Sequence, residues 1–130
     1  MEINSYEKYF NNWECWGSFE PRFDGLNGVY AFRLKAAFPR LKGVTQIVYI
    51  GMCNQNPKGK NPGLLFRLQN YLQNLAGGSN RLKDLEAEFK GRAGIEYAYV
   101  VCDYPRVVEK ALLEDYYKQH LELPPLDRAG

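Results

Sequence analysis

The sequence predicts one small α+β domain, in which two strands, two helices, a third strand and a last helix follow an aromatic leader. Two short apolar runs with a tyrosine in each, GVYAFRL and IVYIG, are typical of neighbouring strands. Longer segments on either side of the alternating run IEYAYVVC repeat apolar residues at a helical period. The chain has 130 residues and is 45% hydrophobic, which suffices for one domain with a modest core.

Residues 1–25 are expected to form the leader, and residues 26–130 the domain. Ser5 is placed to cap a short helix over SYEKYFNNW, and Pro21 and Gly25 break the segment after it. We expect the leader to pack across the domain, while the alternative is that its aromatic rings stack on nucleic acid. These aromatic residues are Tyr6, Tyr9, Phe10, Trp13, Trp16, Phe19 and Phe23.

The first two strands are expected over residues 28–35 and 45–50. The segment between them, AAFPRLKG, contains Pro39 and Gly43, as a hairpin connection should. The composition of residues 52–63 predicts a loop, because asparagine, proline and glycine dominate it.

The middle of the chain predicts two helices. GLLFRLQNYLQNL has a helical period and ends at Gly77 and Gly78, while Ser79 caps a second helix, NRLKDLEAEFK, closed by Gly91 and Gly94.

A third strand, IEYAYVVC, and a last helix complete the domain. The helix follows Pro105 as RVVEKALLEDYYKQHLEL and stops at Pro124 and Pro125.

Charge and cysteine content narrow the class of protein. The formal net charge of +2 is too small to indicate a nucleic-acid partner by itself. Cys15, Cys53 and Cys102 are scattered singly, which argues against a disulfide framework and against a zinc site. The sequence has no apolar run long enough for a bilayer and no secretory signal at its start, so we expect a cytoplasmic protein with no membrane partner.

Four segments together resemble the GIY-YIG nuclease family: GVY, then VYIG, then LLFRLQNYL, then EKALLEDYYKQH with PPLD. The resemblance covers roughly residues 26–127. It implies a small three-stranded antiparallel sheet flanked by helices, and a metal-dependent endonuclease that hydrolyses phosphodiester bonds, with DNA as the expected substrate. The cofactor it implies is Mg²⁺ or Mn²⁺.

The resemblance also assigns site residues. It matches the tyrosines of the two motifs to Tyr30 and Tyr49, the helix arginine to Arg67, the position four residues later to Tyr71, and the metal-binding glutamate to Glu114. An arginine fork suits a phosphate, and one carboxylate can hold a hydrated Mg²⁺ that stabilises the leaving oxygen. Tyr30 would activate the water, although its ordinary pKa near 10 requires help from a neighbouring cation or from metal-bound water. Tyr49 and Tyr71 would orient the water or the phosphate.

The last helix offers two glutamates, Glu109 and Glu114. Five residues place them about 140° apart on a helix, so both cannot face one cleft. Periodicity alone does not choose, because both flank the expected core stripe; the resemblance favours Glu114. That stripe is Val108, Ala111, Leu112, Asp115 and Gln119.

The chain departs from the family pattern in several places. The stretch between Gly51 and Arg67 is longer than in compact members, and its Lys58 and Lys60 are candidates, with Arg67, for contacts to a nucleic-acid backbone. Met52 stands where a lysine often follows the second motif, and Asp127 stands near the usual asparagine.

The sequence also supports expectations about two further residues, His120 and Asp127, and about partners of the chain. We expect His120 to be a surface residue, and the role of Asp127 is left open. Sequence specificity would come from a further DNA-binding domain or partner protein outside this chain. The alternatives are a non-catalytic nucleic-acid-binding module of the same fold, and a structural or protein-interaction domain whose tyrosines serve only the sheet.

Overall fold

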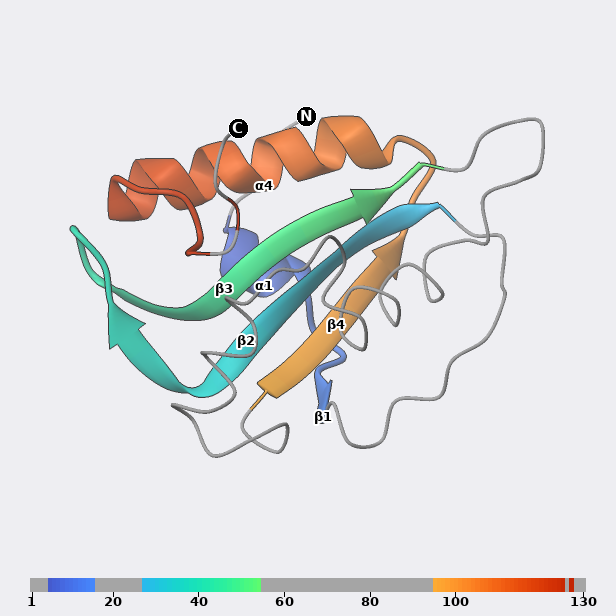
Figure 1. Cartoon of the computed structure of the whole chain (residues 1–130). Helices are drawn as coiled ribbons and strands as arrows, with labels where there is room; N and C mark the ends of the chain where they lie inside the picture. Colours follow the sequence, from blue (N-terminus) through green and yellow to red (C-terminus); the bar gives the residue numbers. More distant parts are fainter. Residues whose placement is uncertain (1–4, 16–26, 55–94, 126, 128–130) are drawn as a thin grey trace.

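A computed structural model describes residues 5–15, 27–54, 95–125 and 127 (Figure 1). Its elements are α1 (Tyr6–Tyr9), β1 (Glu14–Cys15), β2 (Gly28–Pro39), β3 (Val44–Cys53), β4 (Ile95–Val101) and α4 (Pro105–His120). The two middle helices and most of the expected loop lie outside the described residues. The helix expected over SYEKYFNNW is shorter than predicted: α1 covers only Tyr6–Tyr9, and Ser5 precedes it without a capping hydrogen bond from its side chain. The α+β class is confirmed.

The strands form one antiparallel sheet in the order β1-β4-β2-β3. The expected number of three strands is wrong, because the leader itself adds a fourth: Glu14 pairs with Tyr97, and Cys15 with Glu96. The Tyr97 hydroxyl also donates to Oε2 of Glu14 at 3.0 Å. The leader therefore adds a fourth strand to the sheet, beside β4.

The hairpin of β2 and β3 is longer than the sequence predicts. Strand β2 continues through the AAFP segment to Pro39, and the turn closes between Arg40 and Gly43, where the Arg40 amide donates to the Gly43 carbonyl at 3.0 Å. Gly43 has a φ of 71°, which glycine adopts without a Cβ clash. The expected hairpin is confirmed, with a tighter turn and longer strands.

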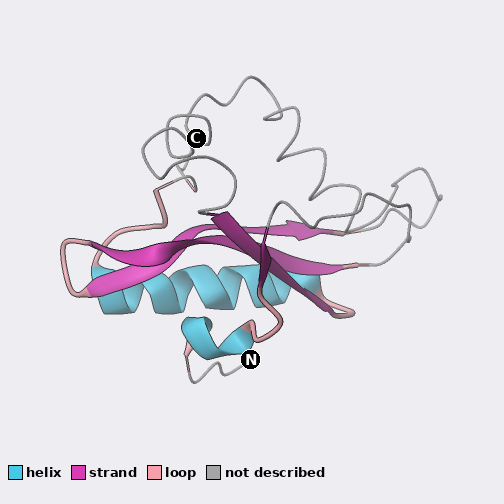
Figure 2. Cartoon of the chain, turned by 90° about the horizontal axis from the view of Figure 1, so that it is seen from below, coloured by secondary structure: helices cyan, strands magenta, loops and turns pink. Residues whose placement is uncertain are grey.

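Helices α1 and α4 lie on the same face of the sheet (Figure 2). Side chains of β2 and β3 that point to this face, including Val29, Ala31 and Ile50, form one buried cluster with Leu112 and Tyr116 of α4. Alternation along a strand then places Tyr30 and Phe32 on the opposite face.

Helix α4 buries a different stripe from the one expected. Its buried residues are Pro105, Val108, Leu112, Tyr116 and His120. The expectation that His120 lies on the surface is wrong, because only 3% of this residue is exposed. The helix ends at His120 rather than near Pro124, since Leu121 adopts a φ of 61° and its amide donates to the Tyr117 carbonyl at 2.7 Å.

A buried polar network fastens α1 to this face. The Tyr6 amide donates to Oδ2 of Asp115 at 2.8 Å, and the Tyr6 hydroxyl shares a hydrogen bond with Oγ1 of Thr45 at 2.7 Å. The same hydroxyl contacts Nε2 of His120, whose Nδ1 lies 2.8 Å from the Lys42 carbonyl. One tyrosine thus connects α1, β3, α4 and, through His120, the hairpin turn.

In the part of the chain that the structure describes, neither helix has the length and apolar character needed to cross a membrane.

Candidate active site

The structure brings Tyr30 and Tyr49 together on the sheet face opposite α4. Tyr30 of β2 pairs with Gly51 of β3, and Phe32 pairs with Tyr49, so the two tyrosines are diagonal neighbours. Their ring centroids are 5.9 Å apart. The Phe32 ring stacks on Tyr49 at 5.5 Å, with 24° between the ring planes. The two phenols are thus neighbours, and that they share an active site stays a prediction.

Gly51 creates the space into which both tyrosines fit. A Cβ at this position would lie 2.7 Å from Cε2 of Tyr49 and 2.8 Å from Cζ of Tyr30. It would also lie 2.9 Å from the Tyr30 hydroxyl oxygen. Glycine is therefore required because the rings approach the backbone here, and the spacing of tyrosine and glycine in VYIG has a direct structural cause.

The two tyrosines differ in exposure. Tyr30 is 2% exposed, whereas Tyr49 is partly exposed. A ligand would therefore meet Tyr49 more readily than Tyr30.

Glu114 lies apart from this pair. It is exposed, and at about 100° per residue it lies about 180° from Pro105 around the axis of α4. Since Pro105 belongs to the buried stripe, Glu114 is on the side of α4 that faces away from the sheet. Glu109, about 40° from Pro105 by the same rule, is on the side that packs against the sheet and is half-buried.

Asp127 lies against the edge of β3 at Ile50, the residue that follows Tyr49. Its Oδ1 accepts the amide of Ile50 at 2.8 Å. Burial raises the pKa of the Asp127 carboxyl from 3.8 to about 8; the hydrogen bond from Ile50 lowers it and the negative charge of Glu109 raises it further. Burial also raises the pKa of Glu109, with Arg106 opposing. Two carboxyl groups thus influence each other between α4 and β3.

Met52 points away from the tyrosine pair. It is partly buried and packs against the core cluster beneath α4. The residue after YIG therefore contributes to packing in this chain.

Four of the expected site residues lie outside the described residues: Lys58, Lys60, Arg67 and Tyr71.

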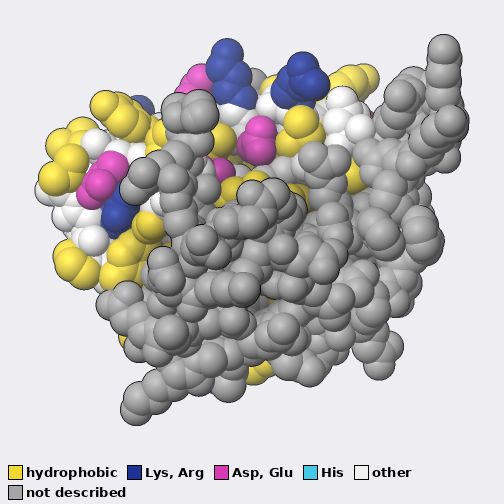
Figure 3. Space-filling model, viewed as in Figure 1, with side chains coloured by type: hydrophobic (Ala, Val, Ile, Leu, Met, Phe, Trp, Pro, Cys, Tyr) yellow, Lys and Arg dark blue, Asp and Glu magenta, His cyan; other side chains and the backbone are white. Residues whose placement is uncertain are grey.

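The described part of one face carries both signs of charge (Figure 3). Basic and acidic side chains are interspersed over α4, and hydrophobic side chains gather at the end where the β2–β3 turn lies. Leu41, Val44 and Leu121, from the turn and the end of α4, are among the exposed apolar residues.

No pattern in the sequence indicates the Tyr6 network or the contact between Asp127 and β3. The one signal for the network is the single histidine, because its two ring nitrogens let it form hydrogen bonds on both sides of the ring.

Comparisons with models of known protein families, with curated proteins and with solved structures found no match to this chain. Within the described residues, no group of three or more histidine, cysteine, aspartate or glutamate side chains could hold a metal ion.

Proposed function

We propose that the chain is a divalent-metal-dependent endonuclease that hydrolyses DNA phosphodiester bonds with a GIY-YIG-like site. The observation that carries the proposal is the packing of Tyr30 and Tyr49 around Gly51, because it gives the GVY and VYIG motifs the shared geometry that the resemblance implies.

The residues have distinct roles in this proposal. Tyr30, ionised with the help of a neighbouring cation, accepts a proton from the attacking water. Tyr49, which is more exposed, orients the water or the phosphate. Arg67 binds the phosphate, because its guanidinium keeps its charge and matches two phosphate oxygens. Tyr71 assists Tyr49, and Lys58 and Lys60 contact the DNA backbone.

The carboxylates of the described residues fit a hydrated Mg²⁺ ion only in part. Glu114 is exposed and can bind a metal that keeps most of its waters, as Mg²⁺ commonly does. Glu109 and Asp127 are nearer to β3, and a cation beside them would lower both raised pKa values. A bound Mg²⁺ would stabilise the charge on the leaving oxygen.

A second candidate function is a non-catalytic nucleic-acid-binding module of the same fold. The position of Glu114 on the far side of α4 favours it, because a metal held there would be remote from Tyr30. The burial of Tyr30 points the same way.

The experiment that separates the two functions is cleavage of plasmid, branched and single-stranded DNA with Mg²⁺ or Mn²⁺, and with chelator. We compare the unchanged protein with Glu114→Gln and with Glu109→Gln, a matched substitution on the same helix. The proposal predicts metal-dependent cleavage that falls at least 10²-fold in Glu114→Gln, as for removal of a group that stabilises transition-state charge. Cleavage lost in Glu109→Gln instead would assign the metal to the pair of Glu109 and Asp127. Salt-sensitive binding without cleavage in all three proteins would establish the binding module.

A further inference from the structure

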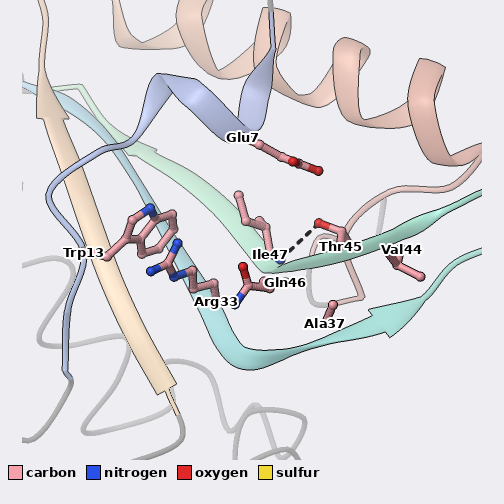
Figure 4. A pocket seen from close by; sticks show the side chains of 8 residues that line it. All are labelled: Glu7, Trp13, Arg33, Ala37, Val44, Thr45, Gln46 and Ile47. Atoms are coloured by element: carbon pink, nitrogen blue, oxygen red, sulfur yellow. Dashed lines mark hydrogen bonds between the residues drawn. The ribbon is translucent and has the colours of Figure 1, made fainter.

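A cavity of about 200 Å³ lies on the helix-bearing face of the sheet, beneath α1 and away from the tyrosine pair. It exists because the β2–β3 ladder is interrupted: Arg33 pairs with Ile47, but the next pair is Phe38 with Thr45. The residues of β2 between Arg33 and Phe38 outnumber those they face on β3, so β2 bulges here. Glu7 of α1 and Trp13 of the leader complete the cavity (Figure 4).

Gln46 presents an acceptor to this cavity. Its side-chain nitrogen donates to the carbonyls of Leu34 and Lys35, at 3.0 and 2.9 Å, and so satisfies backbone groups left by the interrupted ladder. The amide oxygen is thereby turned away from β2, toward the space beside Ile47 (Figure 4).

The cavity carries a positive group at one end. The guanidinium of Arg33 lies over the Trp13 ring at 4.3 Å, and its Nε is 2.7 Å from Oε1 of Glu96. Among the described residues, the side chain of Arg33 forms a hydrogen bond only with Glu96. The Arg33 side chain is 26% exposed. The terminal nitrogens of the fork therefore remain able to donate to an anionic oxygen.

A negative group occupies the other end. Glu7 is exposed, and its Oε1 can accept the Tyr6 hydroxyl at 3.0 Å. The same Oε1 lies 4.0 Å from Nε2 of His120. Among the described residues no group donates to Oε2 of Glu7, so this second oxygen can accept from another donor.

The two charged ends are separated by an apolar floor. Figure 4 shows Arg33 and Trp13 at one end and Glu7 above Thr45 at the other, with the Ile47 side chain between them. At about 30 Å³ for each water, the volume corresponds to about seven water molecules and so to a ligand of about seven non-hydrogen atoms. Opposite charges across an aliphatic floor match an extended zwitterion better than an ion of one sign.

We propose that this cavity binds a small aliphatic zwitterion, whose carboxylate pairs with Arg33, whose chain lies over Ile47 and whose ammonium group pairs with Glu7. The site is independent of the proposed nuclease, because it is on the opposite face of the sheet from Tyr30 and Tyr49.

The test is an NMR titration of the full chain with glycine, 4-aminobutanoate and 6-aminohexanoate, and with butyrate and butylammonium as ligands that have one charged end each. The proposal predicts saturable shifts of the Trp13 indole and the Thr45–Ile47 amides with 4-aminobutanoate, at least tenfold tighter than with either single-ended ligand. Equal binding of butyrate or butylammonium, or no saturable shift with any compound, would overturn it.

Glu7→Gln is the informative variant, because Glu7 is exposed and its loss should leave the fold intact. It should weaken 4-aminobutanoate about tenfold and leave butyrate unchanged, whereas Lys8→Gln, an exposed charge on the same helix, should change neither. Unaltered binding of 4-aminobutanoate by Glu7→Gln contradicts the proposal.

Discussion

Replacing Gly51 with alanine should both destabilise the protein and remove cleavage. The new Cβ would lie within 3.0 Å of both tyrosine rings, and these rings also pack against Phe32. Overpacking of this kind costs about 1–3 kcal/mol of the free energy of unfolding. Displacement of catalytic groups by about 1 Å lowers turnover by about 10²-fold. The measurements are urea unfolding and DNA cleavage in the same buffer.

Gly43→Ala is the matched control for this substitution. Its Cβ would meet the nearest atom, Nδ1 of His120, at an ordinary 3.5 Å, but the φ of 71° is strained for alanine. A left-handed conformation costs an L-residue about 1–2 kcal/mol. We expect Gly43→Ala to lose similar stability and to keep its cleavage rate. Equal cleavage by Gly51→Ala and Gly43→Ala would show that the tyrosine pair is not the reacting site.

The stability of the protein should fall as the pH rises from about 4 to about 8. The folded chain raises the pKa of Asp127 from 3.8 to about 8, so it binds this proton more tightly than the unfolded chain throughout that window. Each bound proton that is favoured in the folded state makes the free energy of unfolding decrease with pH. Below about pH 4 the effect is fully present, and above about pH 8 it is lost.

Asp127→Asn should flatten this dependence. An asparagine oxygen can still accept the Ile50 amide, and the amide never ionises, so the variant should be more stable than the unchanged protein at pH 8. Urea unfolding between pH 4 and pH 9 measures the difference. Asp103→Asn, at an exposed position, controls for the loss of one charge. Parallel pH profiles for Asp127→Asn and the unchanged protein would contradict the assigned burial of Asp127.

The tyrosine pair can be predicted from the sequence, because it follows from the alternation of side chains along each strand and from the short turn between the two strands. Side chains two residues apart share a face of a strand, so Tyr49 and Gly51 must point to the same side. A short turn containing Gly43 makes β2 and β3 neighbours. Pairing of Tyr30 with Gly51 then brings the two phenols together.

Features that depend on tertiary contacts cannot be predicted from residue patterns in this way. Strand β1 is two residues long, and nothing in Glu14 and Cys15 indicates a strand before β4 is beside them. The buried stripe of α4 includes Tyr116 and His120, whose polar atoms are typical of surface residues. Here the Tyr6 hydroxyl and the Lys42 carbonyl bond His120, and the Ile47 carbonyl accepts the Tyr116 hydroxyl. Because the buried stripe of α4 includes Tyr116 and His120 and not Asp115 and Gln119, Glu109 faces the sheet and Glu114 faces away from it.

The proposed site is tested most directly by single-turnover cleavage of supercoiled plasmid with Tyr30→Phe. The variant keeps the ring that packs beside Tyr49 and Phe32 and removes only the hydroxyl. We expect metal-dependent cleavage by the unchanged protein and a rate at least 10²-fold lower in Tyr30→Phe, within the range for loss of a general base. Urea unfolding checks that the variant is folded. A folded Tyr30→Phe that cleaves at the full rate would contradict the role of the tyrosine pair in catalysis.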